Sequence, residues 1–165
     1  MVQVFRSAVT KEAPVTIGLG ISARVRLPYA DALARTVDAL KVEGFGVLTE
    51  IDVRATLKKK LDVSFRPYRI LGACNPRMAH QALLAEDKIG TMLPCNVVVQ
   101  ELESRKIEVS AVDPVASMQA IDNPNPAETA AKIRDTLREV IAEIGALGSS
   151  RAVHQAHWPT TKQAP

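Results

Sequence analysis

The stretch NVVVQELESRKIEVSAV, residues 96–112, decides the fold of this chain. It holds two runs rich in β-branched residues, NVVVQEL (96–102) and KIEVSAV (106–112), joined by a short turn at 103–105. Two runs of this kind joined by a short turn predict an antiparallel β-hairpin. A purely parallel sheet is therefore excluded, and the rest of the chain has to fit around an antiparallel pair.

Further strands and helices alternate along the remainder of the chain. TIGLGISARVRL (16–27) alternates apolar and polar residues, which predicts a single strand with one buried face. Asn75 and Asp113 each stand before a proline, the pattern of a helix N-cap followed by a first helical position, and Asn125 with Glu128 suggests a capping box. Strands are predicted at 16–27, 45–53, 65–73, 96–102 and 106–112, and helices at 28–44, 54–63, 76–85, 114–121 and 125–145.

This order predicts an α+β fold, a two-layer sandwich of about five mostly antiparallel strands with helices packed on one face. The domain is expected to span residues 16–148, after a leader at 1–15 and before a polar tail at 149–165. The last helix has an apolar stripe for the core: Ile133, Leu137, Val140, Ile141 and Ile144. The sheet face that the helices leave uncovered is predicted to carry both polar and apolar side chains: Arg24, Arg26, Leu48, Glu50, Asp52, Arg69, Leu71, Val98, Glu108 and Ser110.

Composition narrows the class of protein. The 165 residues have a net charge of +3, and so small a positive charge does not indicate that the protein binds nucleic acid. The one basic run, Arg54 with Lys58, Lys59 and Lys60, lacks interleaved aromatic residues, so a solvated helix face is expected. The first fifteen residues lack the apolar core of a signal peptide, and no apolar run approaches a membrane span. A cytoplasmic protein without nucleic-acid or membrane partners is therefore expected.

Three motifs carry a family resemblance: GFGVLTEIDV (44–53), FRPYRILGACNP (65–76) and LPCNVVV (93–99). At these motifs the chain closely resembles a small bacterial and archaeal family known only as a domain of unknown function. The resemblance spans roughly residues 17–144. It implies a compact α+β fold like that of TATA-box-binding protein, and a homodimer. It brings no activity, but it marks a shared site: Glu50, Asp52, Arg69, Cys74, Asn75, Cys95 and Asn96.

The two cysteines, Cys74 and Cys95, are open to three interpretations: structural thiols, part of a ligand site, or a redox pair. A straight helix over 76–93 would be about 27 Å long and would separate the thiols. A helix that ends near Ala85 would be about 15 Å long, and residues 86–94 would then fold back and bring the thiols together. Gly90 and Pro94 favour the second arrangement. Two cysteines cannot complete a zinc site, and no metal is predicted.

The carboxylates of Glu50 and Asp52 lie two residues apart on one predicted strand and so point the same way. Arg69 on a neighbouring strand offers a counter-charge. A solvated, salt-bridged sheet face is the simpler expectation, and a polar pocket at a dimer interface is the alternative. Acid–base chemistry would need the two pKa values pushed apart, which a sequence does not show.

Two weaker motifs are set aside. GLGISA (18–23) fits the spacing of a dinucleotide fingerprint, but its glycines lie inside the predicted strand and not at a strand-to-helix turn. His80 is expected at a helix surface. His154 and His157, beside Trp158, have a spacing that suits a metal on a helix, but they stand in the polar tail.

The sequence therefore predicts a cytoplasmic homodimer that binds a small anionic or thiol-reactive molecule, or a protein partner, at a polar site near the two Cys-Asn loops. The alternative is a thiol-based redox enzyme or sensor that uses Cys74 and Cys95, and a third hypothesis is an interaction module with no pocket. No cofactor, reaction or ligand is identified.

Overall fold

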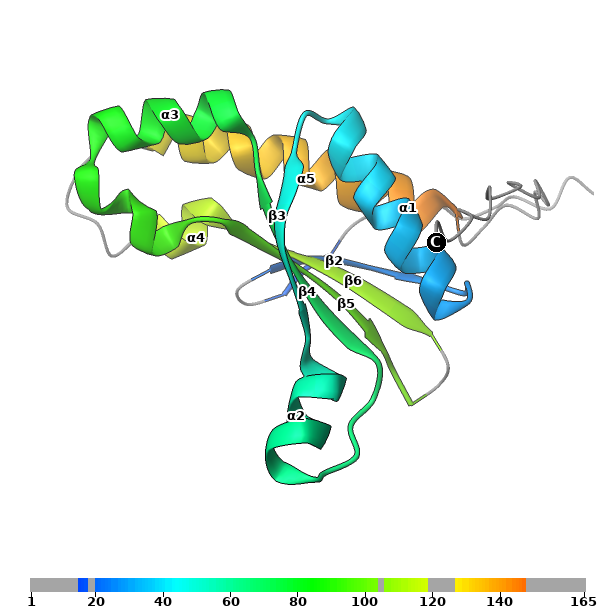
Figure 1. Cartoon of the computed structure of the whole chain (residues 1–165). Coiled ribbons are helices and arrows are strands. Elements are labelled where there is room, and N and C mark those ends of the chain that lie inside the picture. Colours follow the sequence, from blue (N-terminus) through cyan, green and yellow to red (C-terminus); the bar gives the residue numbers. More distant parts are fainter. Residues whose placement is uncertain (1–14, 18–19, 104–105, 119–126, 148–165) are drawn as a thin grey trace, which may run out of the picture.

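Six strands form one antiparallel sheet in the computed structural model, which describes residues 15–17, 20–103, 106–118 and 127–147 (Figure 1). This confirms the predicted α+β class. The leader, the turn residues 104–105, the segment 119–126 with its predicted cap at Asn125, and the tail from residue 148 lie outside the described residues. Across the sheet the order is β1 (Val15–Ile17), β2 (Gly20–Val25), β6 (Ile107–Val112), β5 (Cys95–Glu101), β4 (Tyr68–Cys74) and β3 (Gly46–Asp52).

The hairpin that decides the fold is β5 with β6, paired antiparallel as predicted, with Val98 opposite Ser110. The predicted single strand over 16–27 is wrong. It is two strands, β1 and β2, which pair antiparallel with Thr16 opposite Ile21. Alternation has the same period on both sides of a tight reversal, so the pattern could not reveal the reversal between Ile17 and Gly20.

Two helices cover one face of the sheet, α1 (Tyr29–Val42) and α5 (Ala127–Leu147), which lie beside each other in Figure 1. The predicted stripe of α5 is buried as expected, and Leu137, Val140, Ile141 and Ile144 have no exposed surface. We call this side the helix-covered face. It includes Leu71, expected on the other face but fully buried, together with Ile21, Val25, Val97, Val99 and Val109.

The opposite side, which we call the open face, carries Ser22, Ser110, Val98 and Ile70 in one row across the sheet. Alternation places these residues opposite in direction to Ala23, Val97 and Leu71. The open face therefore combines hydroxyls with half-buried apolar side chains, as expected from the sequence.

Shorter helices lie at the two ends of the strands. α2 (Val53–Leu61) extends away from the body and buries none of its residues, which agrees with the expected solvated basic face (Figure 1). α3 (Pro76–Ala85), the 3₁₀ helix η1 (Asp87–Met92) and α4 (Pro114–Met118) lie at the opposite end. α3 ends at Ala85, and η1 leads back to β5, so the predicted return of residues 86–94 is confirmed.

Local capping signals place these elements. The Asn75 side chain accepts hydrogen bonds from the backbone N–H groups of Arg77 and Met78 at 3.2 and 3.3 Å. The carboxyl group of Asp113 begins α4 in the same way. Gly44, with φ of +78°, follows the end of α1 in a left-handed conformation that costs glycine little.

A β-bulge in β3 changes which side chains share a face. Val47 lies opposite Ala73, but Thr49 lies opposite Gly72, so Leu48 is an extra residue on the β3 side. An extra residue shifts every later side chain to the other face. Glu50 and Asp52 therefore lie on the helix-covered side, not on the mixed face with Ser110 that the sequence predicts. Arg69, also predicted on the mixed face, lies opposite Asp52 and Val99 and so is on the helix-covered side too.

No described helix combines the length and the apolar character that crossing a bilayer requires.

Candidate functional site

Arg69 joins two of the predicted site residues at the α2 end of the sheet. Its guanidinium pairs with a Glu50 carboxylate oxygen through Nη1 and with Asp52 Oδ2 through Nη2, the latter at 2.9 Å. Asp52 is occupied a second time, because its Oδ1 accepts a hydrogen bond from the Ala55 N–H at 2.8 Å and caps α2. Both carboxylates thus have structural partners, as the salt-bridged expectation describes.

Tyr29 lies beside this cluster and donates a hydrogen bond from its hydroxyl to the Val99 carbonyl oxygen at 3.1 Å. Burial raises the pKa of Tyr29 to about 12, an effect that the positive charge of Arg69 opposes and that Asp52 and Glu50 reinforce. A phenol held protonated and bonded to backbone does not serve as a general base near neutral pH.

The other predicted residues lie at the opposite end of the strands. Arg69 and Cys74 are five residues apart on β4, about 16 Å at roughly 3.3 Å per residue. The predicted convergence of the carboxylates with both Cys-Asn pairs is therefore wrong. Extended strands hold the two groups apart, and the residues form two separate clusters.

Cys74 and Cys95 do lie on neighbouring strands, since Cys95 is opposite Ala73. The pleat directs Cys95 into the helix-covered side, where it is 6% exposed, whereas Cys74, one position beyond Ala73, points to the other side and is partly buried. Both are free thiols. Burial raises the pKa of Cys74, and burial, with a smaller contribution from Cys74, raises the pKa of Cys95 to about 11.

The two asparagines also separate. Asn75 is committed to capping α3. Asn96 is exposed and lies opposite Gly72, so its side chain is on the open face. Of the predicted set, Cys95 and Asn96 line a common cavity.

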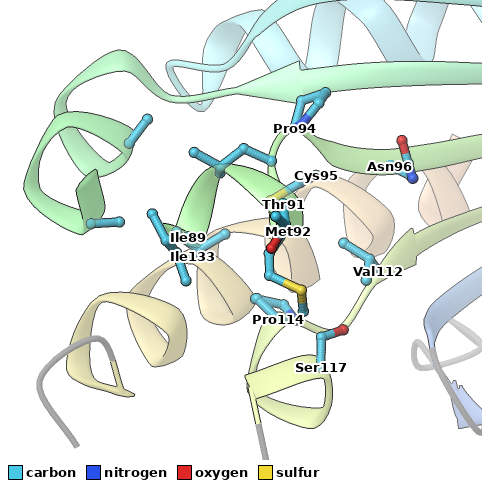
Figure 2. Close-up of a pocket in the computed structure, with 13 residues that line it drawn as sticks. Ile89, Thr91, Met92, Pro94, Cys95, Asn96, Val112, Pro114, Ser117 and Ile133 are labelled. Carbon is cyan, nitrogen blue, oxygen red and sulfur yellow. The ribbon is translucent and has the colours of Figure 1, made fainter. Parts of the chain in front are cut away.

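That cavity, of about 270 Å³, lies where β5 begins and β6 ends, beside α3, η1, α4 and α5 (Figure 2). We call it the η1 cavity. Its lining is mostly aliphatic, with Thr91, Ser117 and Asn96 as the polar members, and Figure 2 shows these polar residues together with Met92 and Val112. The full lining is Ala79, Ala82, Ile89, Thr91, Met92, Leu93, Pro94, Cys95, Asn96, Val112, Pro114, Ser117 and Ile133.

Sequence reasoning missed most of this lining. One signal was present: Ala79 and Ala82 stand three residues apart on α3, where larger apolar residues would fill the space against the body of the domain. Periodicity identifies a helix face but not what the face leaves empty, so the cavity was not predicted.

A broad trough on the open face is a second concave surface, of about 520 Å³. A chain of polar contacts starts at two of its lining residues and continues beyond them: Arg24 Nε donates to Glu108 at 2.8 Å, Gln100 Nε2 donates to the same carboxylate at 3.1 Å, and Arg66 Nη2 donates to Gln100 at 2.8 Å. Arg66 also stacks over Phe65, with its Cζ 4.6 Å from the ring centroid. The side chains in this chain of contacts therefore already have hydrogen-bond partners within the protein.

The structure describes one of the three histidines and can be searched for metal-binding groups. His80 is exposed on α3. His154, His157 and Trp158 lie outside the described residues. Within the described part of the chain, no group of three or more His, Cys, Asp or Glu side chains is arranged to hold a metal ion.

Comparison with known proteins adds a family and a fold. A family model described as a domain of unknown function, DUF302, matches residues 21–144. The crystal structure of an uncharacterized conserved DUF302 protein from Bacillus stearothermophilus is similar, with a TM-score of 0.71 and 28% sequence identity over 76% of this chain and 97% of that one. Among curated proteins no significant sequence match is found.

Proposed function

We propose, from the premise that this chain belongs to the DUF302 family of domains of unknown function, that it binds a small molecule in the η1 cavity. One observation carries the proposal: a mostly apolar hollow with a few polar groups lies at the start of β5, within the LPCNVVV motif. Concave, mainly apolar sites with a few placed polar groups are the usual form of small-molecule sites.

The walls of the η1 cavity come from segments far apart in the chain. Ile89 of η1, Cys95 of β5 and Ile133 of α5 all line the cavity and are buried. Such walls are fixed by the core, so a ligand would meet a largely preformed surface and lose little free energy in ordering it. By contrast, the Glu50–Arg69–Asp52 cluster is closed by its own ion pairs.

Filling the cavity is expected to abolish ligand binding. Ala82 is 3% exposed and lines the cavity, so Ala82→Leu puts three more heavy atoms into it. We expect single-ring fragments detected by saturation-transfer NMR on the wild-type protein to lose at least about tenfold in affinity. Ala85→Leu makes the same change at an exposed position of the same helix and should retain binding.

Equal fragment binding by wild-type protein and Ala82→Leu would overturn the proposal. If Ala82→Leu does not fold, as judged by circular dichroism, Ala79→Leu tests the same wall from a position that is only partly buried.

The alternative function, thiol redox chemistry, is disfavoured by the raised pKa of both thiols, because the thiolate is the reactive species. We expect Cys95, studied in Cys74→Ser, to be alkylated at about pH 8 at least tenfold more slowly than free cysteine. The rate should rise about tenfold per pH unit up to the pKa of Cys95, since deprotonation limits it, and that pKa stays raised by burial although the smaller contribution of Cys74 is removed. Cys95→Ser reports Cys74, whose alkylation is expected to be slower than that of free cysteine because burial raises its pKa. An alkylation midpoint below about 8.5 for either thiol would instead support the redox function.

A homodimer, which the family resemblance implies, and a cytoplasmic location stay predictions. Sedimentation velocity checks the first, with a dimer giving twice the mass of the chain. A monomer at micromolar concentration would contradict it, and it would leave the proposal of a binding site within one chain intact.

A further inference from the structure

We infer that the η1 cavity takes an uncharged, largely apolar ligand that carries a hydrogen-bond donor, such as a small phenol or alcohol. This inference rests on the proposed ligand-binding function and specifies its ligand class. It replaces the anionic ligand expected from the sequence.

The first step is the charge of the lining. None of the described residues that line the η1 cavity is Asp, Glu, Lys, Arg or His. A charged ligand would lose its hydration on entry without meeting an opposite charge, and burial of an unpaired charge is strongly unfavourable. An uncharged ligand avoids this cost.

The second step concerns anions in particular. Asp113 stands between the lining residues Val112 and Pro114 and is 6% exposed. Its Oδ1 already accepts hydrogen bonds from the N–H groups of Val115 and Ala116, at 3.0 and 3.3 Å. This acid, which adjoins the lining residues in sequence, therefore offers a carboxylate or phosphate no hydrogen-bond donor, and the N–H groups of Val115 and Ala116 are already taken.

The third step is the direction of hydrogen bonding. Thr91 donates its hydroxyl proton to the Lys88 carbonyl oxygen at 2.9 Å, and Ser117 donates its own to the Asp113 carbonyl oxygen at 3.1 Å. A hydroxyl has one proton to donate and two lone pairs that accept. Both hydroxyls are therefore left as acceptors toward a ligand, and a ligand O–H or N–H group complements them, whereas the exposed Asn96 amide can donate or accept.

The fourth step is size. An apolar cavity of about 150 Å³ is enough to bind benzene. The η1 cavity, at about 270 Å³, has room for one ring with a short substituent. A para-substituted phenol has this size, one donor and no charge near neutral pH.

Three matched probes test the inference on the full chain near pH 7: 4-ethylphenol, its methyl ether 4-ethylanisole, and 4-ethylbenzoate. Titration calorimetry or NMR shift titration gives each dissociation constant. We expect 4-ethylphenol to bind tightest, 4-ethylanisole to bind about fivefold more weakly through loss of its donor, and 4-ethylbenzoate to bind at least a hundredfold more weakly. Ala82→Leu should lose the phenol, and Ala85→Leu should keep it.

Ser117→Ala supplies the internal control, because it removes one acceptor from the wall. It should weaken 4-ethylphenol a few-fold and leave 4-ethylanisole unchanged. Equal loss of both probes, or tighter binding of the ether than of the phenol, would overturn the role of the donor. Binding of 4-ethylbenzoate as tight as that of the phenol, lost in Ala82→Leu, would overturn the inference while the proposed function stands. If Ala82→Leu leaves the binding of every probe unchanged, the proposed function fails as well.

Discussion

Leu137→Ala is expected to lower the free energy of unfolding by about 2–5 kcal/mol, the range for truncating a fully buried leucine. Leu137 has no exposed surface and belongs to the core between α5 and the sheet. The loss combines the burial of the removed methyl and methylene groups with the cavity that rigid neighbours leave behind. Urea unfolding followed by circular dichroism measures it, and the midpoint should fall while the slope stays the same.

Leu84→Ala is the matched control for Leu137→Ala. Leu84 is 76% exposed on α3, so the same truncation should change stability by no more than about 0.5 kcal/mol. A whole domain is stable by only about 5–15 kcal/mol, so a loss at the upper end of the expected range can unfold Leu137→Ala altogether. Ile141→Val then makes a smaller cut in the same stripe, expected at about 0.5–1.5 kcal/mol. Equal effects of the buried and exposed leucines would contradict the packing of α5.

The helix caps and the buried stripe of α5 could be predicted from the sequence because each depends on a few neighbouring residues. Asn75 and Asp113 cap α3 and α4 as predicted, and Gly44 follows the end of α1. The stripe of α5 is buried because its spacing matches one helix face. Each of these features needs only a window of one or two turns, and no information from distant segments enters.

The sheet face was predicted wrongly for Glu50 and Asp52, because one extra residue in β3 changes the register before them. The bulge at Leu48 moves Glu50 and Asp52 to the helix-covered side, and its one mark in the sequence is a break in alternation, the adjacent apolar residues Val47 and Leu48. The bulge is defined by the pairing of Val47 and Thr49 with β4, and pairing is not encoded in the alternation of one strand. A prediction from period alone therefore groups side chains that the folded sheet separates.

The η1 cavity could not be predicted from the sequence for a related reason. Cys95 was singled out by residue type, but its partners in the wall, such as Ile89, Ser117 and Ile133, come from three other elements. An empty volume is what remains after these elements pack, and no single motif specifies it. The absence of charge from the wall, on which the ligand class depends, becomes visible only when the lining is assembled.

Gly72→Ala is expected to destabilise the domain by about 1–3 kcal/mol, the cost of forcing an extra carbon into a filled site. A Cβ at residue 72 would lie 2.6 Å from Pro94 Cγ and would also collide with the Thr49 hydroxyl. The Thr49 side chain can rotate away, but the ring of Pro94 cannot. Adding Thr49→Ala to Gly72→Ala should therefore restore only part of the lost stability. Gly46→Ala is the control: its nearest contact would be the Cys74 carbonyl oxygen at 3.9 Å, and no loss of stability is expected. Thermal unfolding compares the wild-type protein, Gly72→Ala, Gly72→Ala with Thr49→Ala, and Gly46→Ala. Equal melting temperatures for the two single glycine variants would contradict the close approach of Pro94 to β4.

Because Pro94 also lines the η1 cavity, its displacement in Gly72→Ala should weaken 4-ethylphenol binding, whereas Gly46→Ala should bind as the wild-type protein does.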